Sequence, residues 1–233
     1  MSKTGHSISF LFLMLSLFTS KITNAQDWAG LKVFEEANKE LGDPGPGEAR
    51  VVFMGNSITI GWLQKVPGFF KGKPYINRGI SGQTTAQMLL RFRQDVLALQ
   101  PKAVIILAGT NDIAGNTGPT TLDQILDNLI SMTELALVNK VEPILCSVLP
   151  ARRYHWKPSK QPDKKIPELN AMIRDYAASR NLIYVDYFGA MANPDNGLDP
   201  KLAQDGVHPT PEGYALMAPL AEAAILKAIS RNP

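Results

Sequence analysis

The sequence predicts an α/β fold, a three-layer α/β/α sandwich built on a mainly parallel sheet. Short apolar runs rich in β-branched residues alternate with longer stretches in which apolar residues recur at helical spacing. The short runs are apolar throughout, as in strands that helices cover on both faces. A chain of 233 residues, 45% of them hydrophobic and 19% charged, is long enough to form one sizeable core.

The first 25 residues are typical of a secretory signal peptide. Lys3 supplies the positive charge, and residues 8–18 form an almost unbroken apolar run that is too short to span a bilayer. Small residues precede Gln26, so we expect cleavage after Ala25, a single domain over residues 26–233, and a secreted or periplasmic protein. An uncleaved anchor is the alternative. The leader contains no cysteine, which argues against a lipid-anchored N-terminus.

The charge balance gives no reason to expect nucleic acid or an anionic membrane as a partner. The formal charge is +3, and without Lys3 and Lys21 it falls to +1, since 22 basic residues then face 21 acidic ones. We expect no stable membrane insertion after cleavage.

The single cysteine, Cys146, lies in an apolar run without a neighbouring base, which predicts a buried core residue and not a nucleophile.

The predicted elements follow one another in regular order. A helix is expected over residues 27–41, followed by a Gly- and Pro-rich loop and a first strand over residues 51–54. Further strands are expected near residues 75–76 and over residues 103–107, 143–149 and 182–185. Further helices are expected over residues 84–99, 121–139, 165–180 and 211–229. The long loop 150–164 is rich in Arg, Pro and aromatic residues, which is typical of a functional loop.

Ser57 is the first hydroxyl side chain after the first predicted strand. Open parallel sheets bind ligands beyond the carboxyl ends of their strands, so Ser57 lies where a reactive group is useful. Serine also commonly caps helices. This stretch alone does not separate a nucleophile from a cap.

His208 is the best candidate for the base that a nucleophilic serine needs. Of the three histidines, His6 lies in the leader and His155 has no acidic neighbour. Asp205 precedes His208 by three residues, and a short turn can bring its carboxylate onto the imidazole and set the tautomer. Pro209 keeps His208 extended, just before a helix begins. On its own, this pair also fits a weak surface ion pair.

Two more strand-end loops offer donors for a developing oxyanion. Gly82 presents a backbone N–H that no side chain blocks, and Asn111 has a side-chain amide with two N–H bonds. Each residue alone also fits an ordinary turn. The conjunction of Ser57, Gly82, Asn111 and the Asp205–His208 pair, in this order, favours acyl transfer.

These motifs resemble the four sequence blocks of the SGNH hydrolase superfamily, also called the GDSL-type lipases and esterases. The resemblance extends from about Val51 to the C-terminal helix. The matching residues are Gly55, Asn56 and Ser57 in the first block, Asn77, Gly79 and Gly82 in the second, Gly109, Asn111 and Asp112 in the third, and Asp205 and His208 in the last. Asn56 stands where the family usually has Asp.

The resemblance implies a flavodoxin-like sheet and a serine esterase that forms an acyl-enzyme. Its catalytic triad would be Ser57, Asp205 and His208. Its oxyanion hole would comprise the backbone N–H groups of Ser57 and Gly82 and the amide of Asn111. Such an enzyme needs no cofactor and no metal, and the sequence contains no metal-ligand cluster.

The substrate is harder to predict. Residues 113–118 are small and polar, without an apolar lid, which favours a short acyl group, acetyl above all, on a small-molecule or glycan ester. A lysophospholipase or a platelet-activating-factor-acetylhydrolase-like lipid esterase is the alternative, and a non-catalytic carbohydrate-binding protein is the third hypothesis. Candidate substrate contacts are Asn56, Arg152, Tyr154, His155 and Trp156. The aromatic residues among them fit packing on the protein equally well.

Overall fold

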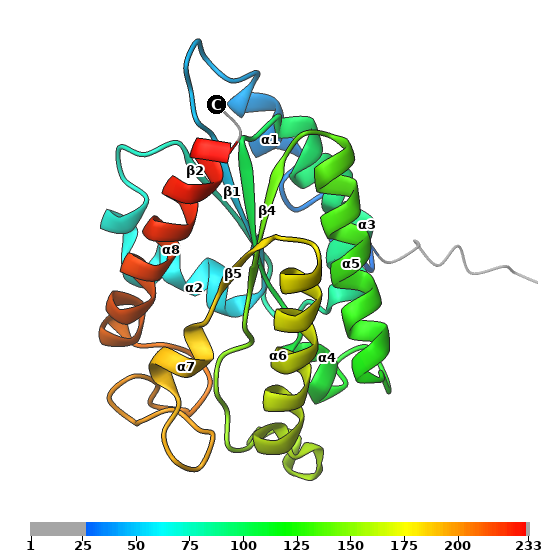
Figure 1. The fold of residues 1–233 in the computed structure, drawn as a ribbon, viewed down its shortest axis with the longest axis vertical. Helices are drawn as coiled ribbons and strands as arrows, with labels where there is room; N and C mark the ends of the chain where they lie inside the picture. Colours follow the sequence, from blue (N-terminus) through cyan, green and yellow to red (C-terminus); the bar gives the residue numbers. More distant parts are fainter. Residues whose placement is uncertain (1–26, 232–233) are drawn as a thin grey trace, which may run out of the picture.

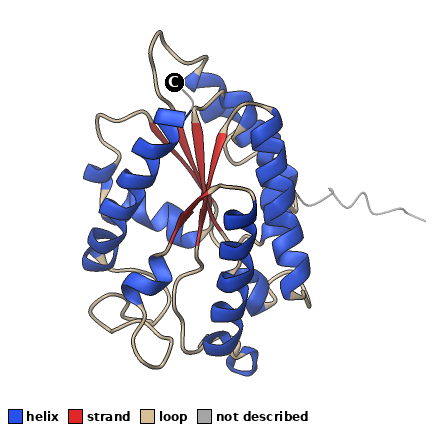
Figure 2. Ribbon diagram, viewed as in Figure 1, coloured by secondary structure: helices blue, strands red, loops and turns tan. Residues whose placement is uncertain are grey.

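The structure, a computed structural model, describes residues 27–231 and has three layers (Figure 1). Five parallel strands form the middle layer, with helices on both faces (Figure 2). The strands are β1 (Val51–Gly55), β2 (Tyr75–Gly79), β3 (Ala103–Leu107), β4 (Glu142–Cys146) and β5 (Ile183–Val185). Their order, β2-β1-β3-β4-β5, is the flavodoxin-like order and confirms the predicted α/β class. The predicted leader, residues 1–25, lies outside the described residues.

Successive strand residues point alternately into two hydrophobic cores. Val52 and Met54 of β1 pack into one core, and Val51 and Phe53 into the other. The first core lies under α3 (Thr85–Asp95), α5 (Leu122–Val138) and α6 (Pro162–Ser179), on the right of Figure 1. The second lies under α2 (Ser57–Lys65) and α8 (Pro211–Arg231), on the left. Burial on both faces explains why the strands are apolar throughout.

The strand register brings the loops that follow the strands to one edge of the sheet. Gly55, the last residue of β1, is level with Gly79 of β2 and Leu107 of β3. The segments that begin with Asn56, Ile80 and Ala108 therefore start side by side. Two short helices, α4 (Thr110–Ala114) and α7 (Tyr187–Met191), also follow strands at this edge. Single 3₁₀ turns complete the structure at Pro67–Phe69, Leu97–Leu99 and Pro158–Lys160.

Helix α8 is long and apolar enough to cross a membrane, with a mean hydropathy of 1.2. In this fold it contacts β4 and β5 and buries Tyr214, Met217, Ala221 and Ile225 against the sheet. A helix that packs on a sheet can be as long and as apolar as a membrane span. The contacts of α8 with the core therefore account for its apolar face.

The predicted helix over residues 27–41 is wrong in its first half. Helix α1 is short, Glu35–Leu41, and turns precede it. Gly30 has a φ of +69°, which ends any helix there, and the carboxylate of Asp27 accepts the N–H groups of Leu31 and Lys32, each at 2.8 Å. Smaller corrections affect α6, which begins at Pro162, and β4, which ends at Cys146. Cys146 is buried and free, as predicted.

Candidate active site

Ser57 is the first residue of α2, directly beyond the carboxyl end of β1. The cap of that helix is Asn56, whose side-chain oxygen accepts the N–H of Ile58 at 3.0 Å. The Ser57 hydroxyl is therefore not needed as a cap. Asn56 itself is only 1% exposed, so its interpretation as a substrate contact is wrong. Asn fills the cap position as Asp would, because only the oxygen accepts a bond there.

The structure brings Ser57, His208 and Asp205 into one hydrogen-bonded chain. Ser57 Oγ lies 2.9 Å from His208 Nε2, and His208 Nδ1 lies 2.7 Å from Asp205 Oδ2. The other carboxylate oxygen, Asp205 Oδ1, accepts the backbone N–H groups of Val207 at 2.9 Å and of His208 at 2.8 Å. An ionised carboxylate at Nδ1 favours the tautomer protonated there, which leaves Nε2 free to accept a proton from the serine.

The pKa of Asp205 reflects two opposing effects. Burial raises it, but hydrogen bonds from the backbone and side chain of His208 and from the backbone of Val207 lower it, and the net pKa lies below the usual value of 3.8. The carboxylate is therefore ionised at neutral pH, as a partner for an imidazolium must be.

The segment that carries His208 is fastened to α2, the helix that carries Ser57. The Nζ of Lys65 donates to the carbonyl of Pro209 at 2.7 Å. The hydroxyl of Tyr214, in α8, donates to the carbonyl of Ile58 at 2.7 Å. These two contacts hold the loop before α8 and the first turn of α8 against the two ends of α2, so that packed elements set the distance from serine to histidine.

The two predicted oxyanion residues follow neighbouring parts of the sheet: Gly82 lies in the loop after β2, and Asn111 lies in α4, after β3. Gly82 is exposed and has a φ of +78°, a left-handed conformation that favours glycine. The side-chain amide of Asn111 donates one N–H to the carbonyl of Gln83 at 3.0 Å, which leaves its second N–H for another acceptor. Asn116 donates to the carbonyl of Gly82, also at 3.0 Å. Residues that follow β3 thus hold the loop after β2 at two adjacent positions, Gly82 and Gln83.

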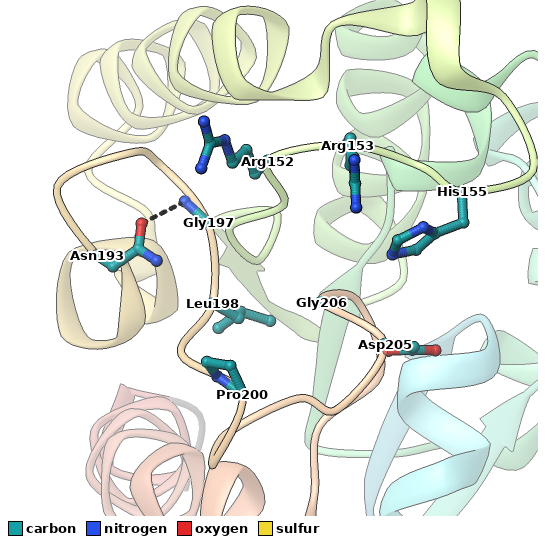
Figure 3. Close-up of a pocket in the computed structure, with 9 residues that line it drawn as sticks. All are labelled: Arg152, Arg153, His155, Asn193, Gly197, Leu198, Pro200, Asp205 and Gly206. Carbon is teal, nitrogen blue, oxygen red and sulfur yellow. Dashed lines mark hydrogen bonds between the residues drawn. The ribbon is translucent and has the colours of Figure 1, made fainter.

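A cavity of about 460 Å³ lies beside the carboxylate of Asp205. It is lined by the loop after β4, with Arg152, Arg153 and His155, and by Asp205 and Gly206 (Figure 3). Among the described residues, no group of three or more His, Cys, Asp or Glu side chains gathers as a metal site.

The structure corrects the prediction that Tyr154 contacts substrate. Its side chain is fully buried, and its hydroxyl lies 2.7 Å from Thr110 Oγ1. Trp156 stacks on it at 5.2 Å between ring centroids and keeps about half of its surface exposed, 45%. A turn, closed by the N–H of Lys157 donating to the carbonyl of Tyr154 at 3.0 Å, folds the chain back so that the Trp156 ring covers the Tyr154 ring.

Comparison with known proteins identifies the family of the chain. Residues 53–216 match the model of the GDSL-like lipase/acylhydrolase family. The chain belongs to this family, and thus to the SGNH hydrolases. It is accordingly a carboxylester hydrolase. A solved structure of a Bacteroides fragilis protein assigned to the acylhydrolases is 46% identical, with a TM-score of 0.84, and the match covers 87% of this chain and 98% of that one.

Two curated relatives are more distant. The uncharacterized lipoprotein YqeF of Bacillus subtilis is 28% identical over 216 residues, which cover 76% of this chain and 89% of the relative. An acetylxylan esterase of Geobacillus stearothermophilus is 25% identical over 203 residues, which cover 75% of this chain and 92% of the relative.

This acylhydrolase also contains a buried arginine behind the site that the sequence patterns did not reveal. Arg91, fully buried in α3, donates to the carbonyls of Gly55 at 3.2 Å and Arg78 at 2.8 Å, and to the side chain of Gln83 at 2.6 Å. Its charge is paired with Asp95 at 3.0 Å. The available signal was a charged residue on the apolar face of a helix, three residues after the buried Met88.

Proposed function

We propose that the protein is a secreted serine esterase that removes short acyl groups, acetyl above all, from carbohydrate esters. The observation that carries the proposal is the chain of contacts from Ser57 through His208 to Asp205, at 2.9 and 2.7 Å, at the carboxyl end of β1. Nucleophile, base and orienting carboxylate are the minimum set for acyl transfer through an acyl-enzyme.

The mechanism follows from these positions. Ser57 Oγ attacks the ester carbonyl while Nε2 of His208 takes its proton, and Asp205 stabilises the imidazolium. The developing oxyanion receives hydrogen bonds from the backbone N–H groups of Ser57 and Gly82 and from the free N–H of Asn111. His208 then protonates the leaving alcohol. Water, activated by the same histidine, releases the acid and restores Ser57.

Two features support a short acyl group on a sugar. One relative is an acetylxylan esterase. The cavity beside the triad is lined by Arg and His side chains and by a few apolar residues, a composition suited to a polar alcohol and not to a long hydrocarbon chain. The lipid esterase remains the alternative outcome of the test below.

The test compares Ser57→Ala, His208→Ala and Asn111→Ala with the wild type on 4-nitrophenyl acetate and acetylated xylan. Loss of the nucleophile or base should lower kcat by about 10⁴-fold or more. Loss of the oxyanion amide should lower kcat by roughly 10²–10³-fold. Ser179→Ala, at an exposed site at the end of α6, is the control. Wild-type turnover by Ser57→Ala would refute the nucleophile.

The same assay separates the alternatives. We expect 4-nitrophenyl acetate to be hydrolysed with a higher kcat/KM than the octanoate. Preference for eight-carbon or longer chains would favour the lipid esterase. Glycan binding without Ser57-dependent hydrolysis of any ester would favour the non-catalytic hypothesis.

We further propose that residues 1–25 are a cleaved leader and that residues 26–233 are the single functional domain. The charged start, the short apolar run and the small residues before Gln26 support this. One relative is a lipoprotein, but this leader has no cysteine, which supports release without a lipid anchor. The intact mass of the exported protein measures the cleavage position; an uncleaved mass would contradict it.

A further inference from the structure

We propose that the cavity beside Asp205 binds the alcohol part of the ester and selects a negatively charged group on it, such as the carboxylate of an acidic sugar. This inference rests on the proposed esterase function, because it assigns the two sides of the scissile bond from the roles of Ser57 and His208.

The position of the cavity identifies the alcohol side. The leaving alcohol takes its proton from His208 and therefore departs on the histidine side of the carbonyl. The cavity is lined by Asp205 and Gly206, which belong to the same loop as His208, and by residues that follow β4. Gly82 follows the edge strand β2, and β1 lies between β2 and β4. The strand order thus places Gly82 and the cavity residues that follow β4 on opposite sides of the end of β1.

The cavity contains one uncompensated positive charge. Arg153 is exposed and has no hydrogen bond or ion pair with any residue in the range 27–231, and its guanidinium points into the cavity together with His155 (Figure 3). Arg152 instead pairs with Asp195 at 3.1 Å. The carboxylate of Asp205 is directed to His208 and to the backbone of its own turn. No carboxylate that lines the cavity therefore neutralises Arg153.

A guanidinium matches the geometry of a carboxylate, to which it donates two parallel hydrogen bonds. Leu198 and Pro200 add apolar surface to the cavity wall, against which a sugar ring can rest. A volume of about 460 Å³ is sufficient for a saccharide unit. The phosphate of a glycerophosphate carries the same kind of charge, so the experiment includes it as a separate arm.

The experiment uses two acetyl esters that differ only in charge. Monoacetylated methyl glucoside and methyl glucuronide share the ring and the ester, and only the second has a carboxylate. We expect the full-length wild type to hydrolyse the glucuronide ester with a kcat/KM about tenfold higher, and this preference to fall with added salt. Arg153→Gln should remove the preference, mainly through KM. Arg153→Glu should invert the preference, so that the neutral ester has the higher kcat/KM. Misfolding would lower the activity on both esters and would not produce such an inversion.

The controls separate this inference from the proposed function. Arg93→Gln removes the same charge from the exposed surface of α3 and should retain the preference. An equal loss of the preference in Arg93→Gln, or no preference in the wild type, would overturn the anionic subsite. The proposed esterase function would still stand in that case, provided that hydrolysis depends on Ser57. Absence of Ser57-dependent hydrolysis of every ester would refute the esterase itself. A larger Arg153-dependent gain on acetyl glycerophosphate would support the subsite and identify phosphate as its anion.

Discussion

At the scale of single residues, the carboxylates of Asp205 and Asp112 have pKa values shifted in opposite directions. Asp205 accepts hydrogen bonds from His208 that lower its pKa, although burial acts in the other direction. Asp112 is 2% exposed, and burial raises its pKa from 3.8 to about 6, although the backbone N–H and hydroxyl of Thr85 donate to it. The first carboxylate is suited to stabilise an imidazolium. The second carboxylate links α4 to the start of α3.

The raised pKa of Asp112 predicts a pH-dependent cost in stability. The folded state binds the proton more tightly, so the free energy of unfolding falls as the pH rises from about 4 to about 6 and is level above that. A shift of about two units corresponds to about 3 kcal/mol. Asp112→Asn lacks this cost, so its free energy of unfolding relative to that of the wild type should rise by up to about 3 kcal/mol between pH 4 and pH 7. Urea unfolding at each pH measures the difference.

The control for this prediction is Asp127→Asn on the exposed side of α5. It should show no such growth between pH 4 and pH 7. A pH-independent difference between Asp112→Asn and the wild type would contradict the assignment of the cost to Asp112.

At the scale of elements, the position of Ser57 depends on how closely α2 approaches β2. A Cβ atom on Gly79 would lie 2.4 Å from the backbone nitrogen of Ile60 and 2.8 Å from the carbonyl oxygen of Asn56. Ile60 belongs to the first turn of α2 and Asn56 is the cap of that helix, so the two residues flank Ser57. Backbone atoms cannot move aside as a side chain can, so the helix as a whole would have to shift.

Gly79→Ala should therefore impair both stability and catalysis. We expect a loss of about 1–3 kcal/mol in the free energy of unfolding, as for other overpacked sites, and a lower kcat on 4-nitrophenyl acetate because Ser57 moves relative to His208. Gly68→Ala is the matched control: a Cβ there meets no atom within 4 Å, and the residue has no positive φ. Full activity in Gly79→Ala would show that α2 can shift without loss.

At the scale of the whole molecule, Arg91 joins parts of the chain that meet only in the folded protein. Its guanidinium links the ends of β1 and β2 to Gln83, whose carbonyl accepts the amide of Asn111. Desolvation by burial lowers the pKa of this guanidinium, and its contact with Asp95 acts in the opposite sense. The network connects the end of β1, two residues before Ser57, with Gln83, which follows Gly82 and accepts the amide of Asn111.

Replacing Arg91 alone should lower the free energy of unfolding more than replacing Arg91 and Asp95 together. Arg91→Met leaves the carboxylate of Asp95, also fully buried, without its cation, at a cost of about 3–5 kcal/mol in the free energy of unfolding. The double variant Arg91→Met/Asp95→Leu should recover part of that loss in urea unfolding. Lys39→Met, which breaks exposed pairs on α1, should cost less than about 1 kcal/mol. Equal effects of the single and double variants would contradict a buried ion pair.

The fold class and the order of the candidate site residues could be predicted from the sequence alone. Alternation of apolar strands and amphipathic helices is a local pattern, and it dictates a parallel sheet whose loops collect at one edge. The pair Asp205 and His208 was predictable because three residues of turn suffice to bring carboxylate and imidazole together. Three other features became visible only in the folded chain: α1 is short, Tyr154 is buried while Arg153 faces the cavity, and Arg91 contacts the end of β1, two residues before Ser57. These properties depend on contacts between distant parts of the chain, such as the bond from Gln83 to the carbonyl of Ala29, and local periodicity carries no information about them.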